Sequence, residues 1–227
     1  AAFAAAIKAA EGGATVTMVE RSDVIGGTCV NVGCVPSKIM IRGAQIAQTQ
    51  RQHPFHGVQK HRPKIDRREM LAQQIARVNA LRQSKYERIL RRNDSIALVS
   101  GSASFRNPHT LLVRRSDDST IDVTADRFLI ATGSAPAVPK VPGLDSVPYW
   151  TSTQALFSDT IPEHLVVIGS SVVAVEIAQA YRRLGSAVTM LARTELLSQE
   201  DPALGDGLAE AFAEEGIRVL EKTTACS

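Results

Sequence analysis

The 227-residue sequence has little of what would place it in several common protein classes. Aromatic residues make up 4% of it and the net charge is +3, which disfavours a base-stacking platform and a basic nucleic-acid surface. No run is apolar enough to span a membrane, and no basic region followed by an apolar run marks a signal peptide. The odd count of three cysteines disfavours a secreted disulfide scaffold. We therefore expect a protein of the reducing cytoplasm, with no nucleic-acid or membrane partner.

Both ends of the sequence look cut. It lacks an initiator Met and opens within an alanine-rich helical run, and it ends soon after a strand-like stretch at 217–220. With 44% hydrophobic residues, the chain has enough apolar material for one large domain or one and a half. We therefore expect an incomplete chain, in which the third cysteine, Cys226, is a small core residue or an accident of truncation.

The most informative stretch carries two cysteines, Cys29 and Cys34, five positions apart. A regular helix cannot bring such a pair within the roughly 7 Å between Cα atoms that a disulfide needs, so the chain must bend, and Gly33 allows it. Pro36 suits the first turn of a helix, which would place Cys34 near the positive end of a helix dipole, where a thiolate is stabilised. The spacing alone leaves a redox disulfide and two inert buried cysteines equally open, and it disfavours zinc because the segment has no His.

The first residues read as the second half of a nucleotide-binding unit. An alanine-rich helix over 1–11 ends at two glycines, and a buried strand over 15–20 comes next and ends in Glu20. The first strand and the glycine fingerprint that should come before them are not in the sequence.

A second unit begins with a buried strand at 165–168. A G-x-S-x-x-A turn comes next at 169–174 and opens a helix that runs to about residue 184, with Glu176 in its first turn. The strand at 188–191 then repeats the pattern of the strand at 15–20, and a further helix and strand lie within 201–220. Two such units predict two different nucleotides.

The remaining sequence alternates between regular elements and loops. Three histidines in one polar loop, His53, His56 and His61, fit no rigid zinc motif, so we predict a solvated loop. We predict these elements: a helix over 36–50, a loop over 53–64, a helix over 66–92 with an apolar stripe of Leu71, Ile75, Val78 and Leu81, a strand over 96–99 continuing to Phe105, a hairpin of 110–114 and 120–124, an apolar strand from 127 into Ala131-Thr132-Gly133, and a proline-rich linker over 135–149.

The segment from Gly26 to Lys38 resembles the active-site segment of the flavin-dependent pyridine nucleotide–disulfide oxidoreductases. Within that family, the run from Cys29 to Arg42 most resembles the members that reduce mercury(II). The strand into Ala131-Thr132-Gly133 resembles the family's second flavin-domain signature. The resemblance implies an α/β fold with two truncated Rossmann-like domains: an FAD-binding domain over 1–148 and the start of an NAD(P)-binding domain over 149–227, with the C-terminal dimerisation domain absent.

The same resemblance implies roles for individual residues. Cys29 would exchange with substrate and Cys34 would face the flavin, and both thiols would hold the mercury ion. Lys38 would reach the flavin ring and pair with Glu176, and Tyr86 would lie near the metal's route. The implied FAD contacts are Ala2, Glu20, Gly27, Thr28, Lys38, Ala103, Thr132 and Gly133, and the implied nicotinamide-nucleotide contacts are Gly169, Ser171, Ala174 and Arg193. Glu20, Lys38, Glu176 and Tyr86 each have an ordinary structural alternative, as a solvated charge, an acid favoured by a helix dipole or a packing residue.

The resemblance implies that NADPH reduces FAD, which reduces the Cys29–Cys34 disulfide, and that the two thiolates then bind Hg(II). Electrons from the flavin would then reduce the bound ion and release elemental mercury. NADPH is expected over NADH, because Ala192 stands where Glu20 stands in the first unit, and Arg193 comes directly after it. A homodimer is expected. The alternatives are a dihydrolipoamide- or glutathione-type disulfide reductase and, from another class, a non-enzymatic thiol metal binder.

Overall fold

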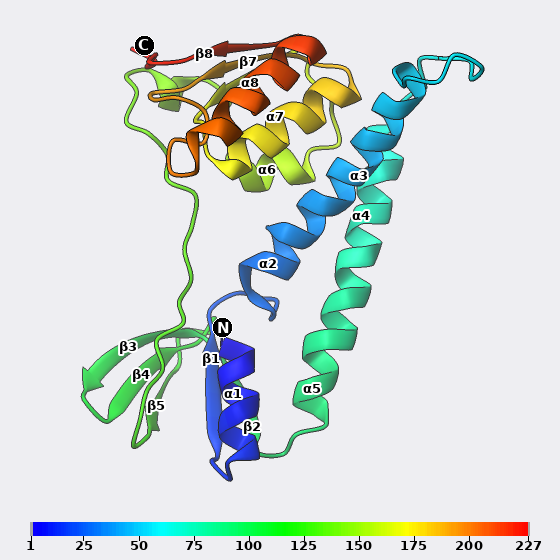
Figure 1. The fold of residues 1–227 in the computed structure, drawn as a ribbon. Coiled ribbons are helices and arrows are strands. Elements are labelled where there is room, and N and C mark those ends of the chain that lie inside the picture. Colours follow the sequence, from blue (N-terminus) through cyan, green and yellow to red (C-terminus); the bar gives the residue numbers. More distant parts are fainter. Residues whose placement is uncertain (1, 227) are drawn as a thin grey trace. The chain divides into compact units, whose positions relative to one another are not determined.

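The computed structural model describes residues 2–226, which form two compact units (Figure 1). Unit 1 comprises Ala1–Asn31 and Arg77–Ser134, and unit 2 comprises Val32–Ala76 and Ala135–Ser227. Compactness therefore groups residues 32–76 with the second nucleotide unit. The predicted division after residue 148 follows the nucleotide sites instead and stays a prediction. Within residues 2–226, no helix combines the length and apolar character that a membrane crossing requires.

Unit 1 contains the predicted helix, turn and strand at the start of the chain. Helix α1 (Ala2–Glu11) ends at the two glycines, and β1 (Val16–Glu20) comes next. The second strand, β2 (Ile96–Ser100), pairs with β1 in parallel, with Val16 opposite Ile96. This part of the prediction is confirmed, with Ala1 outside the described residues.

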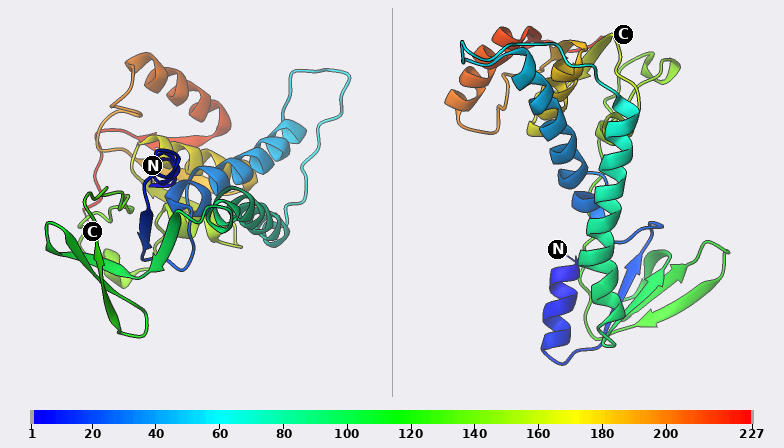
Figure 2. Two further views of the ribbon diagram at one scale, coloured as in Figure 1. Left: turned by 90° about the horizontal axis from the view of Figure 1, so that it is seen from below. Right: turned by 90° about the vertical axis from the view of Figure 1, so that its right-hand side faces the viewer.

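A second sheet in unit 1 is antiparallel (Figure 2). Its strands are β3 (Ser102–Asn107), β4 (Thr110–Arg114) and β5 (Thr120–Thr124), so the predicted hairpin is confirmed. The predicted continuation of the strand at 96–99 through Phe105 is wrong, because β3 pairs with β4 and not with β1. Gly101 makes the turn possible: its φ is +155°, and a Cβ there would lie 2.6 Å from Val113 Cγ1.

The predicted apolar strand from residue 127 is also wrong. Residues 125–140 have no regular structure, and the side chains of Leu129 and Ile130 are 68% and 70% exposed. A strand needs a hydrogen-bonded neighbour, and among the described residues β1 and β2 pair only with each other. An apolar segment without a neighbouring strand therefore stays extended and exposed.

The predicted long helix is built from three consecutive pieces. Helix α4 (Arg67–Arg82) continues into a single π turn, η1 (Gln83–Glu87), and then into α5 (Arg88–Arg91). Asp66 begins the helix, because its Oδ1 accepts hydrogen bonds from the N–H groups of Arg68 (3.0 Å) and Glu69 (3.1 Å).

The predicted apolar stripe of this helix is partly wrong. Val78 is buried and Leu71 and Leu81 are half-buried, but Ile75 is exposed and Gln74 takes the buried position beside it. The buried face therefore runs through Arg67, Gln74 and Val78, a helical spacing that polar side chains obscure in the sequence.

In unit 2, a three-stranded parallel sheet has the order β6-β7-β8. Its strands are β6 (His164–Ile168), β7 (Ala187–Leu191) and β8 (Ile217–Leu220). Helices α7 (Val172–Leu184) and α8 (Pro202–Glu215) connect them, as predicted, and pack on the sheet (Figure 1). The helix α3 (Cys34–Arg51) lies against α7, and its Met40 and Ala44 join the core of this unit. Cys226 is exposed, so the first of its two predicted interpretations, a small core residue, is wrong. The other, an accident of truncation, stays a prediction.

The linker at 135–149 is irregular as predicted, apart from the short helix η2 (Leu144–Ser146). It leads into α6 (Ser152–Phe157), whose last carbonyl groups accept buried hydrogen bonds from side chains. Leu156 O accepts from Arg67 Nη2 (2.8 Å) and Gln74 Nε2 (2.9 Å), and Ala155 O accepts from the Tyr181 hydroxyl (2.7 Å). These bonds anchor α6 to α4 and α7 in unit 2.

Candidate redox and nucleotide sites

The cysteine segment begins in unit 1 with a tight loop and a short helix. Gly26 and Gly27 have φ angles of +109° and +72°, which favour glycine, and α2 (Gly27–Asn31) begins there with Cys29 exposed on it. The sequence did not predict α2, because five residues that include Thr28 and Val30 show no helical period.

Asn31 holds this loop in place. Its Nδ2 donates to the carbonyl oxygens of Ile25 (2.9 Å) and Gly27 (3.0 Å), and its Oδ1 accepts from Arg82 Nη1 (3.0 Å). Arg82 in turn donates to Asn79 Oδ1 (2.8 Å). Sequence reasoning missed both Asn31 and Arg82. An Asn just after a glycine-rich turn is a usable signal for Asn31, whereas nothing in the sequence marks Arg82.

Tyr86 lies in the π turn of unit 1, close to the same loop. Its ring meets the ring of Phe3 edge-on, with 4.9 Å between centroids, and a Cβ on Gly26 would lie 3.3 Å from Tyr86 Cδ2. The structure therefore brings Tyr86 beside the start of the cysteine segment, and a π turn within an α-helix is frequent at functional sites.

Of the predicted FAD contacts in unit 1, Gly133 and Thr28 lie close together, whereas Ala2, Glu20 and Ala103 lie on separate elements. Gly133 has a φ of +71°, and a Cβ there would lie 3.9 Å from Thr28 Oγ1, so the turn after Thr132 meets the start of α2. Glu20 ends β1, and its carboxylate accepts from the Ser22 N–H (2.9 Å). Ala2 is the first described residue of α1, and Ala103 is exposed on β3.

In unit 2, Cys34 is the first residue of α3, with Gly33 as its N-cap. The prediction that Cys34 lies at a helix N-terminus is therefore confirmed, as is the place of Pro36 in the first turn. Lys38 lies one turn further on, and its ammonium forms an ion pair and hydrogen bond with Glu176 of α7. The expected pairing of Lys38 with Glu176 is thus present. Glu176 is the fifth residue of α7, so it lies just beyond the first turn and not within it as predicted.

The predicted nicotinamide-nucleotide turn joins β6 to α7. Gly169 has a φ of +134°, and its N–H donates to Leu191 O (3.0 Å), which ties the turn to β7. A Cβ on Gly169 would lie 3.7 Å from Ala174 Cβ, so the turn packs closely on the helix. Ser171 is the N-cap of α7. The first N–H groups of a helix have no intrahelical partner. A strand, a positive-φ glycine and such a helix N-terminus together form a cradle that fits a pyrophosphate.

The end of β7 carries a small buried residue and then a cation. Ala192 is fully buried, and Arg193 next to it is exposed. An arginine in this place can bind a phosphate on the ribose, whereas a carboxylate would repel it. No group of three or more His, Cys, Asp or Glu residues within 2–226 is arranged to hold a resident metal ion.

Parallel strands joined by a glycine turn to a helix, together with a cysteine pair whose second member begins a helix, define a nucleotide-dependent oxidoreductase of the α/β class. Residues 1–227 match the family model described as pyridine nucleotide-disulphide oxidoreductase, and the chain belongs to that family.

The chain is similar over nearly its whole length to mercuric reductases. It is 60% identical to the mercuric reductase of Shewanella putrefaciens over 224 residues, and 57% identical to that of Shigella flexneri over 226 residues. Each alignment covers 99% of this chain but only 40% of the relative, so the chain spans well under half of these proteins.

Among solved structures, the chain is similar to the HOCl-induced flavoprotein disulfide reductase RclA from Escherichia coli, in its Cu(II) complex. The identity is 27%, the TM-score is 0.82, and the alignment covers 96% of this chain and 46% of that one. The predicted family and fold class are therefore confirmed.

Proposed function

We propose that this chain is part of a longer protein, called the full-length protein below, which reduces mercury(II) to elemental mercury with NADPH. The observation that carries the proposal is the 60% identity to a mercuric reductase over 99% of the chain, a stretch that includes both cysteines. Residues 1–148 would form most of the FAD-binding domain and residues 149–227 the start of the NAD(P)-binding domain. A homodimer in the cytoplasm is part of the same proposal.

FAD, when bound, would supply two electrons from the nicotinamide nucleotide for reduction of the cysteine disulfide and two more for reduction of the bound Hg(II). The chain's own residues would hold the metal and orient the reacting groups. Cys29 and Cys34, once reduced, supply two soft thiolate ligands for Hg(II). Cys34 lies at the N-terminus of α3, and Lys38 is one turn further along the same helix. Glu176 holds the ammonium of Lys38 in place.

The remaining predicted residues bind and orient. Gly27, Thr28, Thr132 and Gly133 would line the flavin nucleotide, with Glu20 on the adenosine ribose and Ala2 and Ala103 as close backbone contacts. Tyr86, beside Gly26, would lie on the metal's path to the thiols. These roles rest on the family resemblance together with the positions described above.

NADPH is the proposed electron donor because of Gly169, Ser171 and Ala174 in the turn and Arg193 after β7. A buried Ala192 leaves no carboxylate to repel a 2′-phosphate, and the exposed Arg193 can bind one. Comparing kcat/KM for NADPH and NADH tests this choice. Arg193→Ala should narrow the preference, and equal kcat/KM values in the unmutated protein would contradict it.

Mercury-dependent oxidation of NADPH by the full-length protein tests the main proposal. Cys29→Ser should abolish it while leaving flavin bound, because Cys29 faces substrate. Cys34→Ser should abolish it and also remove any thiolate–flavin charge-transfer absorption. Full activity in either variant refutes the assignment of the cysteines.

A second candidate function is reduction of a disulfide substrate, which the similarity to a flavoprotein disulfide reductase favours. Assays with Hg(II), glutathione disulfide and lipoamide side by side separate the two. A protein that binds mercury through its thiols but purifies without flavin and oxidises no NADPH would instead be a thiol metal binder.

A further inference from the structure

Side-chain polar contacts join helices α3 and α7 of unit 2 at two levels, and Arg51 at the end of α3 adds a bond to the backbone of α7. Near the start of α3, Lys38 pairs with Glu176 of α7. Seven residues further along both helices, Gln45 Oε1 accepts a hydrogen bond from Arg183 Nη1. Seven residues are about two helical turns, so the two contacts lie on the same faces of the helices. The side chains between the two levels that line the space between the helices are Ile41, Ala44, Gln179 and Ala180.

The two contacts differ in how strongly they hold. The side chains of Lys38 and Glu176 are 60% and 31% exposed, and an ion pair so open to water contributes little to holding two helices together. Arg183 is 16% exposed, and it is held by the carboxylate of Glu215, which is 14% exposed. Of the two side-chain contacts, the one at Arg183 is therefore better shielded from water and better placed to help set the register of α3 on α7.

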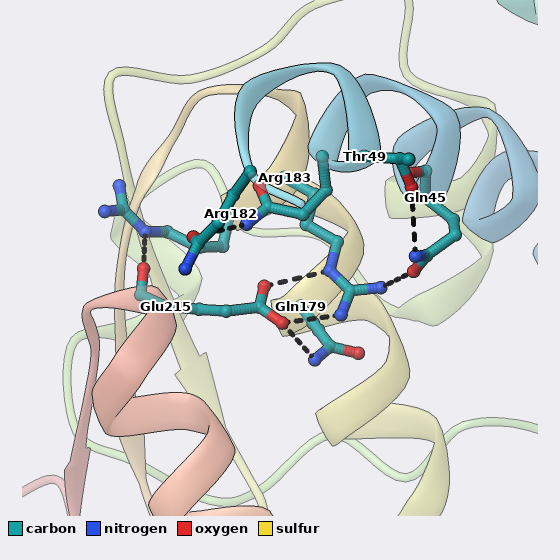
Figure 3. Close-up of polar contacts among 8 residues, drawn as sticks. Gln45, Thr49, Gln179, Arg182, Arg183 and Glu215 are labelled. Carbon is teal, nitrogen blue, oxygen red and sulfur yellow. Dashed lines mark hydrogen bonds and ion pairs between the residues drawn. The ribbon is translucent and has the colours of Figure 1, made fainter. Parts of the chain in front are cut away.

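Glu215 is the last residue of α8 and grips Arg183 with both carboxylate oxygens (Figure 3). Arg183 Nε donates to Oε2 at 2.9 Å and Nη2 donates to Oε1 at 2.5 Å, and Gln179 Nε2 adds a third bond to Oε1 at 2.8 Å. A bidentate pair fixes the plane of the guanidinium group. Its third nitrogen, Nη1, is thereby aimed at Gln45 of α3.

Two further arginines bind the ends of the helices in this cluster. Arg51, the last residue of α3, donates from Nη1 to Arg183 O (2.5 Å), and Arg182 donates from Nε to Glu215 O (2.6 Å). Carbonyl groups in the last turn of a helix lie at the negative end of the helix dipole, and they therefore bind cations favourably. Burial is the largest cause that lowers the pKa of Arg51, and the positive charges of Arg62 and Arg182 lower it further. Within the cluster that Figure 3 draws, Glu215 supplies the carboxylate that balances the positive charge.

We propose that Glu215 is a positioning residue, which sets the register of α3 on α7 through Arg183 and Gln45 and thereby keeps Lys38 on Glu176, one turn from Cys34. The role of Glu215 in positioning α3 on α7 is inferred from the contacts alone, whereas its effect on turnover rests on the proposed function. Without the carboxylate, Arg183 would be a largely buried charge without a counter-ion, and it would turn toward water and away from Gln45.

Glu215→Gln in the full-length protein tests the proposal, because it removes the charge and keeps the shape. Glu214→Gln is the matched control, since Glu214 is the preceding residue of α8 and is exposed. Hydrogen exchange measured by mass spectrometry should show amides of residues 38–48 exchanging about tenfold faster in Glu215→Gln than in the control. Equal exchange of this segment in the two variants overturns the proposal.

The charge swap of Arg183→Glu with Glu215→Arg is the second variant. Gln45 and Gln179 can both rotate their amides to offer the opposite partner atom, so the swap should restore slow exchange in α3. If the swapped protein exchanges as fast as the single variants, the proposal is wrong. Should Glu215→Gln fail to fold, Gln45→Ala removes the side-chain contact of α3 with the Arg183 guanidinium and leaves the bond from Arg51 to Arg183 O in place. Normal exchange of residues 38–48 in that variant overturns the proposal equally.

Turnover supplies the readout that a purely structural role would not move. Glu215→Gln should lower kcat about tenfold with KM for NADPH unchanged, and it should have little further effect in a Glu176→Gln background, because both changes act through Lys38. Additive effects of the two changes contradict the proposed route. If the unmutated protein shows no mercury-dependent turnover, the proposed function fails, while the exchange experiment still decides the role of Glu215.

Discussion

Replacing Asn31 by Ala should loosen the loop that carries Gly26 and Gly27. The amide of Asn31 makes three hydrogen bonds, two to loop carbonyls and one with the guanidinium of Arg82. Neutral bonds contribute about 0.5–1.5 kcal/mol each and bonds to a charged group about 1.5–3 kcal/mol. Because the site is only partly buried, we take the lower ends and expect a loss of about 2–3 kcal/mol in the free energy of unfolding.

Asn31→Asp separates the two kinds of bond. A carboxylate keeps the bond from Arg82 and strengthens it, but it cannot donate to the carbonyl oxygens of Ile25 and Gly27. We therefore expect Asn31→Asp to retain the contact with α4 while freeing the loop, with a smaller loss of stability than Asn31→Ala.

Urea denaturation of the full-length protein measures the stability loss, and hydrogen exchange of residues 25–31 measures the loop. The midpoint should fall without a change in slope, and exchange in the loop should rise in both variants. A loss below about 0.5 kcal/mol in Asn31→Ala, with unchanged exchange, would refute the reasoning, since a surface substitution does no more than that.

Three further predictions concern other parts of the chain. Arg67 is 4% exposed, its Nε and Nη1 have no hydrogen-bond partner within the described residues, and burial lowers its pKa. Arg67→Met fills the same space without a buried charge and should change the free energy of unfolding by less than about 1 kcal/mol, whereas Arg67→Ala leaves a cavity and should cost about 2–4 kcal/mol. Equal losses of the two variants in urea denaturation would contradict this. Burial raises the pKa of Tyr181 above its ordinary 10.0, so its contribution to stability is intact below pH 10 and is lost as the pH rises through the folded pKa. Tyr181→Phe should therefore lose less stability between neutral and alkaline pH than the unmutated protein does. If both proteins lose stability equally with pH, another group causes the loss. Expressed alone, the 227-residue chain should aggregate, bind FAD poorly and turn over no NADPH with Hg(II), because Leu129 and Ile130 lie exposed; a flavin-loaded monomer in gel filtration would disprove this.

The elements that the sequence predicted well have strong local signals. The helix at the start of the chain ends at two glycines before its strand, and the second nucleotide unit combines a strand, a glycine turn and an amphipathic helix. The hairpin around residues 115–119 appears with the predicted strand bounds, since a turn between two alternating runs fixes its own register.

The features that the sequence could not predict depend on distant partners. An apolar run such as 127–131 becomes a strand only beside another strand, and a sequence window does not show whether one is there. Gln74 is buried because Leu156 O accepts its amide hydrogen, a contact between residues far apart in the chain. The candidate site shows the same difference. The cysteines and Lys38 stand in a recognisable run, whereas the role of Arg82 is seen from its contact with Asn31, which is distant in the sequence.

The π turn at Gln83–Glu87 has a consequence for comparing related genes. A π turn carries one more residue than the α-helical turn it replaces, and each residue of an α-helix turns the next by about 100°. Deleting one codon within it would leave a continuous helix but would rotate Tyr86 and everything after it relative to Arg82. Arg82 would still reach Asn31, while the ring of Tyr86 would leave Gly26 and Phe3. A one-residue gap at this place in an aligned homologue therefore signals the loss of an aromatic neighbour of the cysteine segment, and not a harmless change in loop length.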